Sequence, residues 1–121
     1  MRNYKNIKAY QLADALVIEI YKATKKFPKE ELYGLVSQLR RAAVSIPTNV
    51  AEGASRQHEK DYVHFLYIAR GSAAEVEYLS SLARRLGYLS DQEHEKISAA
   101  AGEVAKMLVG LIRTIQKAYS S

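Results

Sequence analysis

The stretch RRAAVSIPTNVAEG, residues Arg40 to Gly53, combines a helical pattern with a residue that opposes helices. Apolar residues recur across it at helical spacing, including Ala43, Ile46 and Val50, yet Pro47 stands among them. A proline inside a helix removes one backbone hydrogen bond and crowds the carbonyl four residues earlier, at a cost of about 3 kcal/mol. Because the periodicity continues across Pro47, and two half-segments would be too short to span a bundle, we predict one continuous, kinked helix.

The predicted kink has two interpretations. Polar side chains of Ser45, Thr48 or Asn49 can bond the backbone groups that the proline frees. The bend then either wraps the helix around its neighbours or shapes a contact surface. The residues leave both possibilities open.

Four helical segments are predicted along the whole chain, over residues 6–26, 28–53, 55–86 and 91–118. Each carries an apolar stripe at spacings of three and four residues. The predicted stripe residues are Tyr10, Ala13, Val17, Ile20 and Phe27 in the first segment, flanked by Leu12 and Leu16; Leu32, Leu35, Leu39, Ala43, Ile46 and Val50 in the second; Tyr62, Leu66, Ala69, Ala73, Val76, Ser80 and Ala83 in the third; and Ile97, Ala101, Val104, Leu108, Leu111, Ile115 and Ala118 in the fourth.

The predicted helices are separated by residues that start or stop helices. Pro28 ends the first and suits the first turn of the second. Gly53 is predicted to stop the second helix, Ser55 to cap the third and Gly87 to end it. Ser90 and Glu93 form an S-x-x-E capping box at the start of the fourth. No segment alternates as a strand does. Short connections make neighbouring helices antiparallel, so residues 1–121 are predicted to form a single all-α domain, an up-down-up-down four-helix bundle.

Composition is that of an ordinary folded domain: 121 residues, 48% hydrophobic and 26% charged, with no cysteine. No apolar run approaches the roughly 18 residues that span a bilayer. The first residues lack the apolar core of a signal peptide. We therefore expect a cytoplasmic protein with no membrane partner, no disulfide and no thiolate metal site.

Positive charge is concentrated near the N-terminus. The net charge is +5, and residues 1–29 hold seven Lys and Arg against two acids. Two arginine doublets lie inside or late in predicted helices. One arginine of each could pair with an acid such as Glu52 or Glu75, leaving the other to contact phosphate. The candidate nucleic-acid-binding residues are Lys22, Lys25, Lys26, Lys29, Arg40, Arg41, Arg84 and Arg85.

An enzymatic function is not expected. A di-metal bundle needs Glu-x-x-His pairs at one level. The nearest matches, Asp61-x-x-His64 and Asp91-x-x-His94, each begin one of two antiparallel helices, so helix rise predicts that the two motifs lie about 40 Å apart at opposite ends. No nucleophile elbow or phosphate-binding glycine loop is present. Gly71 and Ser72 are interpreted as small residues that permit close packing. We therefore predict no catalytic, cofactor or metal site.

Several irregular motifs carry a family resemblance. They are Gln38-Leu39-Arg40-Arg41-Ala42, Ser45-Ile46-Pro47, Asn49 with Ala51-Glu52-Gly53, Phe27-Pro28 with Glu31, FLYIARGSAAE from Phe65 to Glu75, and LGYLS. Over nearly the whole chain the sequence resembles the four-helix-bundle family named for 23S rRNA intervening sequences. Tyr10 departs from the tryptophan that many members carry. The resemblance implies a bundle that assembles into rings, typically pentamers.

The resemblance also suggests partners. Related accessory proteins of diversity-generating retroelements bind nucleic acid and a reverse transcriptase, although this sequence shows no retroelement-specific feature. The first functional hypothesis is therefore a non-enzymatic oligomer that binds RNA or DNA through basic residues. The alternative is a protein-interaction scaffold or accessory subunit, indicated by tyrosines outside the core stripes at Tyr33, Tyr67, Tyr78 and Tyr119.

Overall fold

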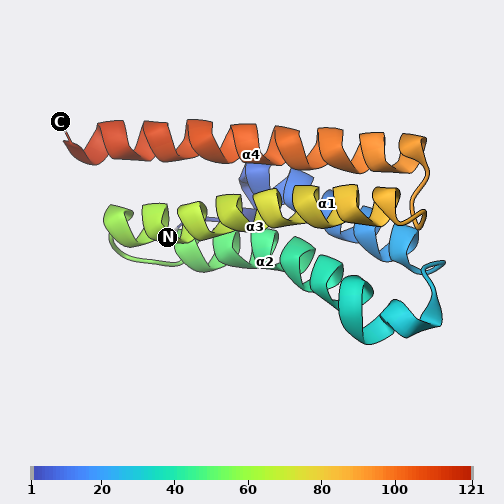
Figure 1. Ribbon diagram of the computed structural model, residues 1–121. Coiled ribbons are helices and arrows are strands. Elements are labelled where there is room, and N and C mark those ends of the chain that lie inside the picture. Colours follow the sequence, from blue (N-terminus) through green and yellow to red (C-terminus); the bar gives the residue numbers. More distant parts are fainter. Residues whose placement is uncertain (1, 121) are drawn as a thin grey trace.

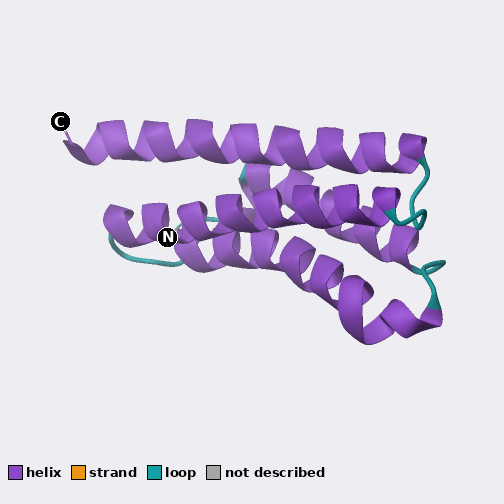
Figure 2. Cartoon of the chain, viewed as in Figure 1, coloured by secondary structure: helices purple, strands orange, loops and turns teal. Residues whose placement is uncertain are grey.

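The computed structural model describes residues 2–120 and contains four long helices, which Figures 1 and 2 show side by side. These are α1 (Lys8–Thr24), α2 (Ser37–Ala54), α3 (Glu59–Arg85) and α4 (Asp91–Ser120). A 3₁₀ turn over Tyr4–Asn6 precedes α1. A second 3₁₀ turn (Lys29–Glu31) and a π-helical turn (Leu32–Val36) precede α2. The predicted all-α, up-down-up-down bundle is confirmed.

The helices differ in length, and this shapes the bundle. α1 has 17 residues and α4 has 30, so α1 covers only part of the length of α4 (Figure 1). The N-terminal segment lies beside the end of α2, where the Arg2 guanidinium donates to the carbonyls of Ala54, the last residue of α2, and of Arg56. Arg2 also forms an ion pair with Glu59. Part of the N-terminal positive charge therefore caps α2 and anchors the chain start.

Pro47 lies inside one uninterrupted helix, as predicted. The Thr48 hydroxyl donates to the Val44 carbonyl at 2.7 Å, and the Asn49 amide donates to the Ser45 carbonyl at 2.8 Å. These side chains supply donors in the turn that the proline weakens. The ribbon of α2 changes direction along its length in Figure 1.

The beginning of the predicted second helix differs from the prediction. Instead of one helix from Pro28, the chain makes a 3₁₀ turn and then a π-helical turn, and Gly34 has non-helical dihedral angles (φ −111°, ψ −110°). The Glu31 carboxylate accepts a hydrogen bond from the Leu35 amide at 3.2 Å. A Cβ at position 34 would lie 2.9 Å from that carboxylate, so glycine leaves room for this cap. The π-helical turn leaves Leu32 exposed rather than in the core.

The predicted helix boundaries are partly correct. Gly87 has a positive φ of 84°, and the amides of Gly87 and Tyr88 donate to the carbonyls of Arg84 and Ala83. This arrangement is a Schellman cap, as predicted. The prediction that Ser55 caps α3 is wrong, because Ser55 follows α2 and its hydroxyl donates to the Glu52 carbonyl at 2.7 Å. α2 itself continues past the predicted stop at Gly53 to Ala54.

The core stripes of α3 and α4 match the predicted positions closely, although Leu111 is half-buried and Ala118 is exposed. The stripe of α1 is displaced by about one position. Its buried residues are Ala9, Ala13, Leu16, Ile20 and Thr24, whereas Tyr10, Leu12 and Val17 are half-buried. Apolar residues on both flanks make this helix ambiguous in sequence. The polar exception, Thr24, donates to the Ile20 carbonyl at 2.8 Å.

Candidate nucleic-acid interface

All eight candidate residues lie at or near one end of the bundle. At this end α1 and α3 finish and α2 and α4 begin (Figure 1). The four lysines lie at the end of α1 and in the following connection, and the arginine doublets lie near the start of α2 and at the end of α3. Antiparallel folding therefore brings together residues that are far apart in sequence.

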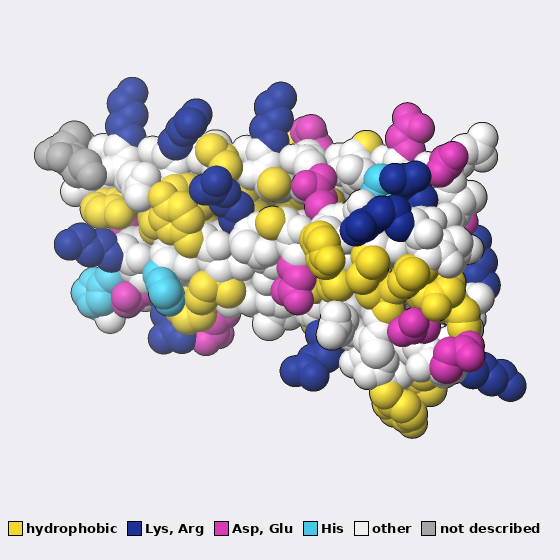
Figure 3. All heavy atoms as spheres, viewed as in Figure 1, with side chains coloured by type: hydrophobic (Ala, Val, Ile, Leu, Met, Phe, Trp, Pro, Cys, Tyr) yellow, Lys and Arg dark blue, Asp and Glu magenta, His cyan; other side chains and the backbone are white. Residues whose placement is uncertain are grey.

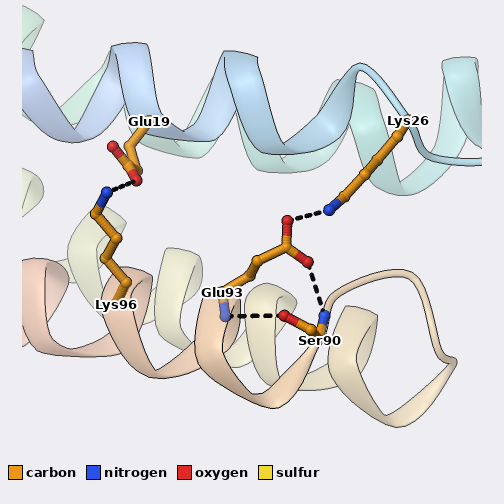
Figure 4. Close-up of polar contacts among 5 residues, drawn as sticks. All are labelled: Glu19, Lys26, Ser90, Glu93 and Lys96. Carbon is orange, nitrogen blue, oxygen red and sulfur yellow. Dashed lines mark hydrogen bonds and ion pairs between the residues drawn. The ribbon is translucent and has the colours of Figure 1, made fainter.

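Two of the eight are neutralised by acids of α4. Lys26 forms an ion pair with Glu93, and Arg84 Nη1 lies 3.4 Å from Asp91 Oδ1. Figure 4 shows the Lys26–Glu93 pair beside a second bridge between α1 and α4, in which Lys96 Nζ lies 2.9 Å from Glu19 Oε1. These contacts hold α1 against α4, so Lys26 is poorly suited to contact phosphate.

Glu93 has a second role at the start of α4. Its carboxylate accepts from the Ser90 amide at 2.8 Å, and the Ser90 hydroxyl accepts from the Glu93 amide at 3.1 Å. The predicted capping box is confirmed (Figure 4). The Lys26 ammonium, followed by the Ser90 backbone amide, lowers the pKa of Glu93 below its ordinary value of 4.5.

Arg40 is held in a structural contact between α1 and α2. Its Nε donates to the Thr24 hydroxyl at 2.9 Å, and its guanidinium lies 4.5 Å from the ring centroid of Tyr21. The guanidinium therefore stacks on an exposed aromatic ring while its Nε joins the two helices. Glu52, one of the acids suggested as a partner for an arginine of the doublets, pairs instead with Arg56 at 2.7 Å.

Arg85 is only loosely held. Its guanidinium lies 5.9 Å from the ring centroid of Tyr78, and its Nε is 3.4 Å from the Ser81 carbonyl. Both Arg85 and Tyr78 are exposed. Arg85 therefore remains accessible to an anion.

Arg41 lies at a polar pocket of about 610 Å³ between α2 and α3. The pocket also contains Glu75, but neither side chain forms a hydrogen bond or an ion pair with another residue within residues 2–119. Of the two acids suggested as partners for the doublets, Glu75 shares this pocket with Arg41 but forms no ion pair with it. Opposite charges at the same pocket remain available to a ligand.

The charge of this end is mixed. Figure 3 shows Lys and Arg side chains beside Asp and Glu side chains where α3 ends and α4 begins. Exposed acids there include Asp91 and Glu95, and Glu30 lies across the bundle end in the α1–α2 connection. The surface is therefore a set of separate cations rather than a uniform positive patch.

The two Asp-x-x-His motifs do not come together in the bundle. Among residues 2–119, no three His, Asp or Glu side chains lie close enough together to hold a metal ion. The motif Asp61–His64 begins α3 and Asp91–His94 begins α4, at opposite ends of the bundle.

No helix in the described part of the chain is long and apolar enough to cross a membrane.

The chain is similar to proteins of one known family. The sequence profile of the 23S rRNA-intervening sequence protein family matches residues 5–110. The chain belongs to this family. Its structure is similar to a crystal structure of a protein of unknown function from the S23 ribosomal protein family of Bacteroides thetaiotaomicron, with 25% identity and a TM-score of 0.81 over 87% of this chain and 95% of that one. No curated protein matches the chain.

The intervening-sequence family assignment confirms the resemblance expected from the motifs. The most distinctive of them, Gln38 to Gly53, forms nearly all of α2. One side of this helix packs in the core, and another contributes Gln38, Arg41 and Ser45 to the polar pocket. The family motif thus encodes both the central packing of α2 and part of a polar site.

Most residues of that pocket are not predicted from the sequence. Besides Arg41 and Glu75, its lining includes Tyr33, Gln38, Ser45 and Ser72. The sequence suggests only packing for Ser72 and only a role at the proline bend for Ser45. A signal is nevertheless present, since positions 38, 41, 45 and 49 form a polar stripe at helical spacing beside the apolar one. The stripe on α3 is shorter, with Ser72 and Glu75 three residues apart.

Proposed function

We propose that this member of the intervening-sequence family is a non-enzymatic oligomer that binds nucleic acid through cations at the end of the bundle described above. The observation that carries the proposal is that most of the eight candidates have no acid partner within residues 2–119. The candidates free of ion pairs are Lys22, Lys25, Lys29, Arg40, Arg41 and Arg85. Such side chains can contact phosphate without first breaking a salt bridge.

The family is named for 23S rRNA intervening sequences, and the cations at this end of the bundle suit the phosphates of a nucleic acid. Phosphate contacts from separate cations position a backbone but do not read a sequence. The expected binding is therefore tolerant of sequence and sensitive to salt.

Assembly would multiply these contacts. Exposed apolar residues occur both on α1 and α2, at Ile18, Tyr21 and Val44, and on α3, at Tyr67 and Tyr78. Val44 lines a groove between α1 and α2, and Tyr67 lines a groove between α3 and α4, so these two residues belong to different surfaces of the bundle. Contacts between unlike surfaces generate rings when the rotation closes. Each ring would then present several copies of the basic end.

The test is a titration of labelled structured RNA and duplex DNA at two salt concentrations. Replacing Lys22, Lys25 and Lys29 by Gln should weaken binding to unrelated sequences alike, and should flatten the salt dependence by about one unit of slope for each phosphate-binding cation removed. The matched control replaces Lys106, Arg113 and Lys117, three exposed cations on α4, with the same change in net charge. Equal effects of both triple variants would show a general charge effect, and absence of binding at low salt would overturn the proposal.

One observation favours a different function. Tyr33 is 93% exposed and Leu32 and Leu86 are about half exposed, all near the same end of the bundle. Exposed aromatic and aliphatic side chains are typical of protein interfaces. A partner protein that stays bound at high salt, combined with no affinity for RNA or DNA, would support an interaction scaffold instead.

A further inference from the structure

The polar pocket between α2 and α3 contains a chemical combination that phosphate binding does not require. A cation (Arg41), an acid (Glu75), an amide (Gln38) and a hydroxyl pair (Ser45 and Ser72) surround one pocket, with Tyr33 at its lining. A surface that only attracts phosphate has no use for an unpaired carboxylate, which repels it. The pocket therefore fits a ligand that offers both donors and acceptors.

The hydroxyl pair leaves one donor for a ligand. Ser72 and Ser45 are joined by a hydrogen bond of 2.9 Å between their Oγ atoms, and the Asn49 amide donates to Ser45 Oγ at 2.9 Å. Two hydroxyls carry two protons, and the bond between them uses only one. The second proton remains available, and Asn49 holds Ser45 in place. Ser72 is buried, so the pair lies at the floor of the pocket.

Tyr33 is presented by the unusual start of α2. The Glu31 carboxylate, which caps the Leu35 amide, also accepts from the Tyr88 hydroxyl at 3.1 Å, so the turn is tied to the α3–α4 connection. Within this π-helical turn Tyr33 is 93% exposed, and its ring stacks on no other aromatic or cationic side chain among residues 2–119. An exposed aromatic ring at the lining of a pocket, on a turn whose backbone is tied down, provides a stacking surface for a planar ligand.

We infer that this pocket binds an unpaired guanine base, stacked on Tyr33 with Glu75 accepting from its Watson–Crick edge. Guanine presents two adjacent donors there, N1–H and the N2 amino group, which match a carboxylate that only accepts. Its O6 and N7 are acceptors, which suit the Arg41 guanidinium and the Gln38 amide. Adenine, cytosine and uracil lack the paired donors. For a guanine within RNA, the inference rests on the proposed nucleic-acid binding; free guanosine monophosphate presents the same base.

The first experiment measures binding of single-stranded oligocytidylates that carry isolated guanosines, inosines or adenosines. Inosine differs from guanosine only by the missing N2 amino group. We expect guanosine to bind about tenfold tighter than inosine, as for one bidentate pair. Glu75→Gln should remove this ratio, because an amide cannot accept from both donors. Glu103→Gln, an exposed acid on α4 with the same change in charge, should keep it.

The second experiment separates stacking from edge recognition. Tyr33→Ala should weaken all purine-containing strands by about tenfold, whereas Tyr33→Phe should retain affinity. Calorimetry with free guanosine and inosine monophosphates then tests the base without a strand. Circular dichroism of each variant verifies the fold.

The outcomes distinguish this inference from the proposed function. If strands bind but guanosine and inosine are equivalent, or Glu75→Gln leaves their ratio unchanged, the pocket inference is overturned and the proposed function stands. If no strand binds at low salt but guanosine monophosphate binds the wild type and not Glu75→Gln, the proposed function fails and the pocket serves a free nucleotide. If neither binds, both are wrong.

Discussion

Single residues determine how closely the helices approach, and Gly53 is the clearest case. It is buried inside α2, and a Cβ there would lie 2.8 Å from Phe65 Cβ and 3.1 Å from the Tyr62 carbonyl oxygen. A backbone atom and the first carbon of a side chain cannot move away without shifting the helix. Gly53 is thus a contact point between α2 and α3 rather than the helix stop expected from sequence.

Gly71 provides the opposite case and a matched control. It is exposed in the middle of α3, and a Cβ there would meet nothing within 4 Å. Its interpretation as a close-packing residue is wrong within the single chain. We expect Gly53→Ala to lower the free energy of unfolding by about 1–3 kcal/mol through overpacking. Gly71→Ala should raise it by about 0.5–1 kcal/mol, because alanine favours helix. Denaturant unfolding measures both, and a stable Gly53→Ala would contradict the close contact.

At the scale of an element, one carboxylate at the start of α4 both caps the helix and forms an ion pair with the residues that follow α1. Glu93 completes the capping box with Ser90 and joins α4 to Lys26 after α1. We expect Ser90→Ala to lower the free energy of unfolding by about 1 kcal/mol because the cap is removed. Thermal or urea unfolding provides the measurement, and an unchanged stability would show that the box adds nothing to the folded state.

The same carboxylate makes a pH-dependent contribution. Because folding lowers the pKa of Glu93, its stabilising effect is present above the ordinary value of 4.5 and is lost as pH falls through the lowered value. The difference in unfolding free energy between wild type and Glu93→Gln should therefore be greatest near neutral pH and shrink under acid. Glu95→Gln, an exposed neighbour, serves as the control. If the difference in unfolding free energy between wild type and Glu93→Gln grew as pH fell, folding would not lower the pKa of Glu93.

The second element-scale prediction concerns Pro47. Replacing it by Ala restores one backbone N–H, so α2 should remain helical and its axis should straighten. Circular dichroism should report no loss of helix, and a crystal structure of Pro47→Ala would report the axis. A loop between Ser45 and Asn49 in the Pro47→Ala structure would contradict the prediction that this segment forms one continuous helix.

For the whole molecule, the prediction is assembly. Light scattering should report a species several times the 13.6 kDa of one chain, and we expect five subunits, the number that the family resemblance implies. Ile18→Glu places a charge among the exposed apolar residues of α1 and should lower the mass, while circular dichroism verifies that the bundle persists. A wild-type monomer at micromolar concentration would contradict both the ring and the multivalent binding.

The number and type of helices, and most of the cores of α3 and α4, followed from the chain alone. Those helices carry one dominant apolar stripe each, and the caps at Gly87 and Ser90 act within a few residues. Interactions of such short range depend on neighbouring sequence only. In α1, apolar residues flank the stripe on both sides, so only packing decided that Ala9 and Leu16 face inward while Tyr10 and Val17 are half-buried.

The candidate site depended on contacts across the bundle. Sequence identified the basic residues, but ion pairing of Lys26 with Glu93 and the stacking of Arg40 on Tyr21 join positions that lie on different helices or far apart along the chain. Arg41 and Glu75 meet at one pocket only because α2 and α3 run antiparallel at a close distance. Charge and periodicity are properties of the chain, whereas partners are chosen by tertiary packing, which decides whether a cation is neutralised or remains available to a ligand.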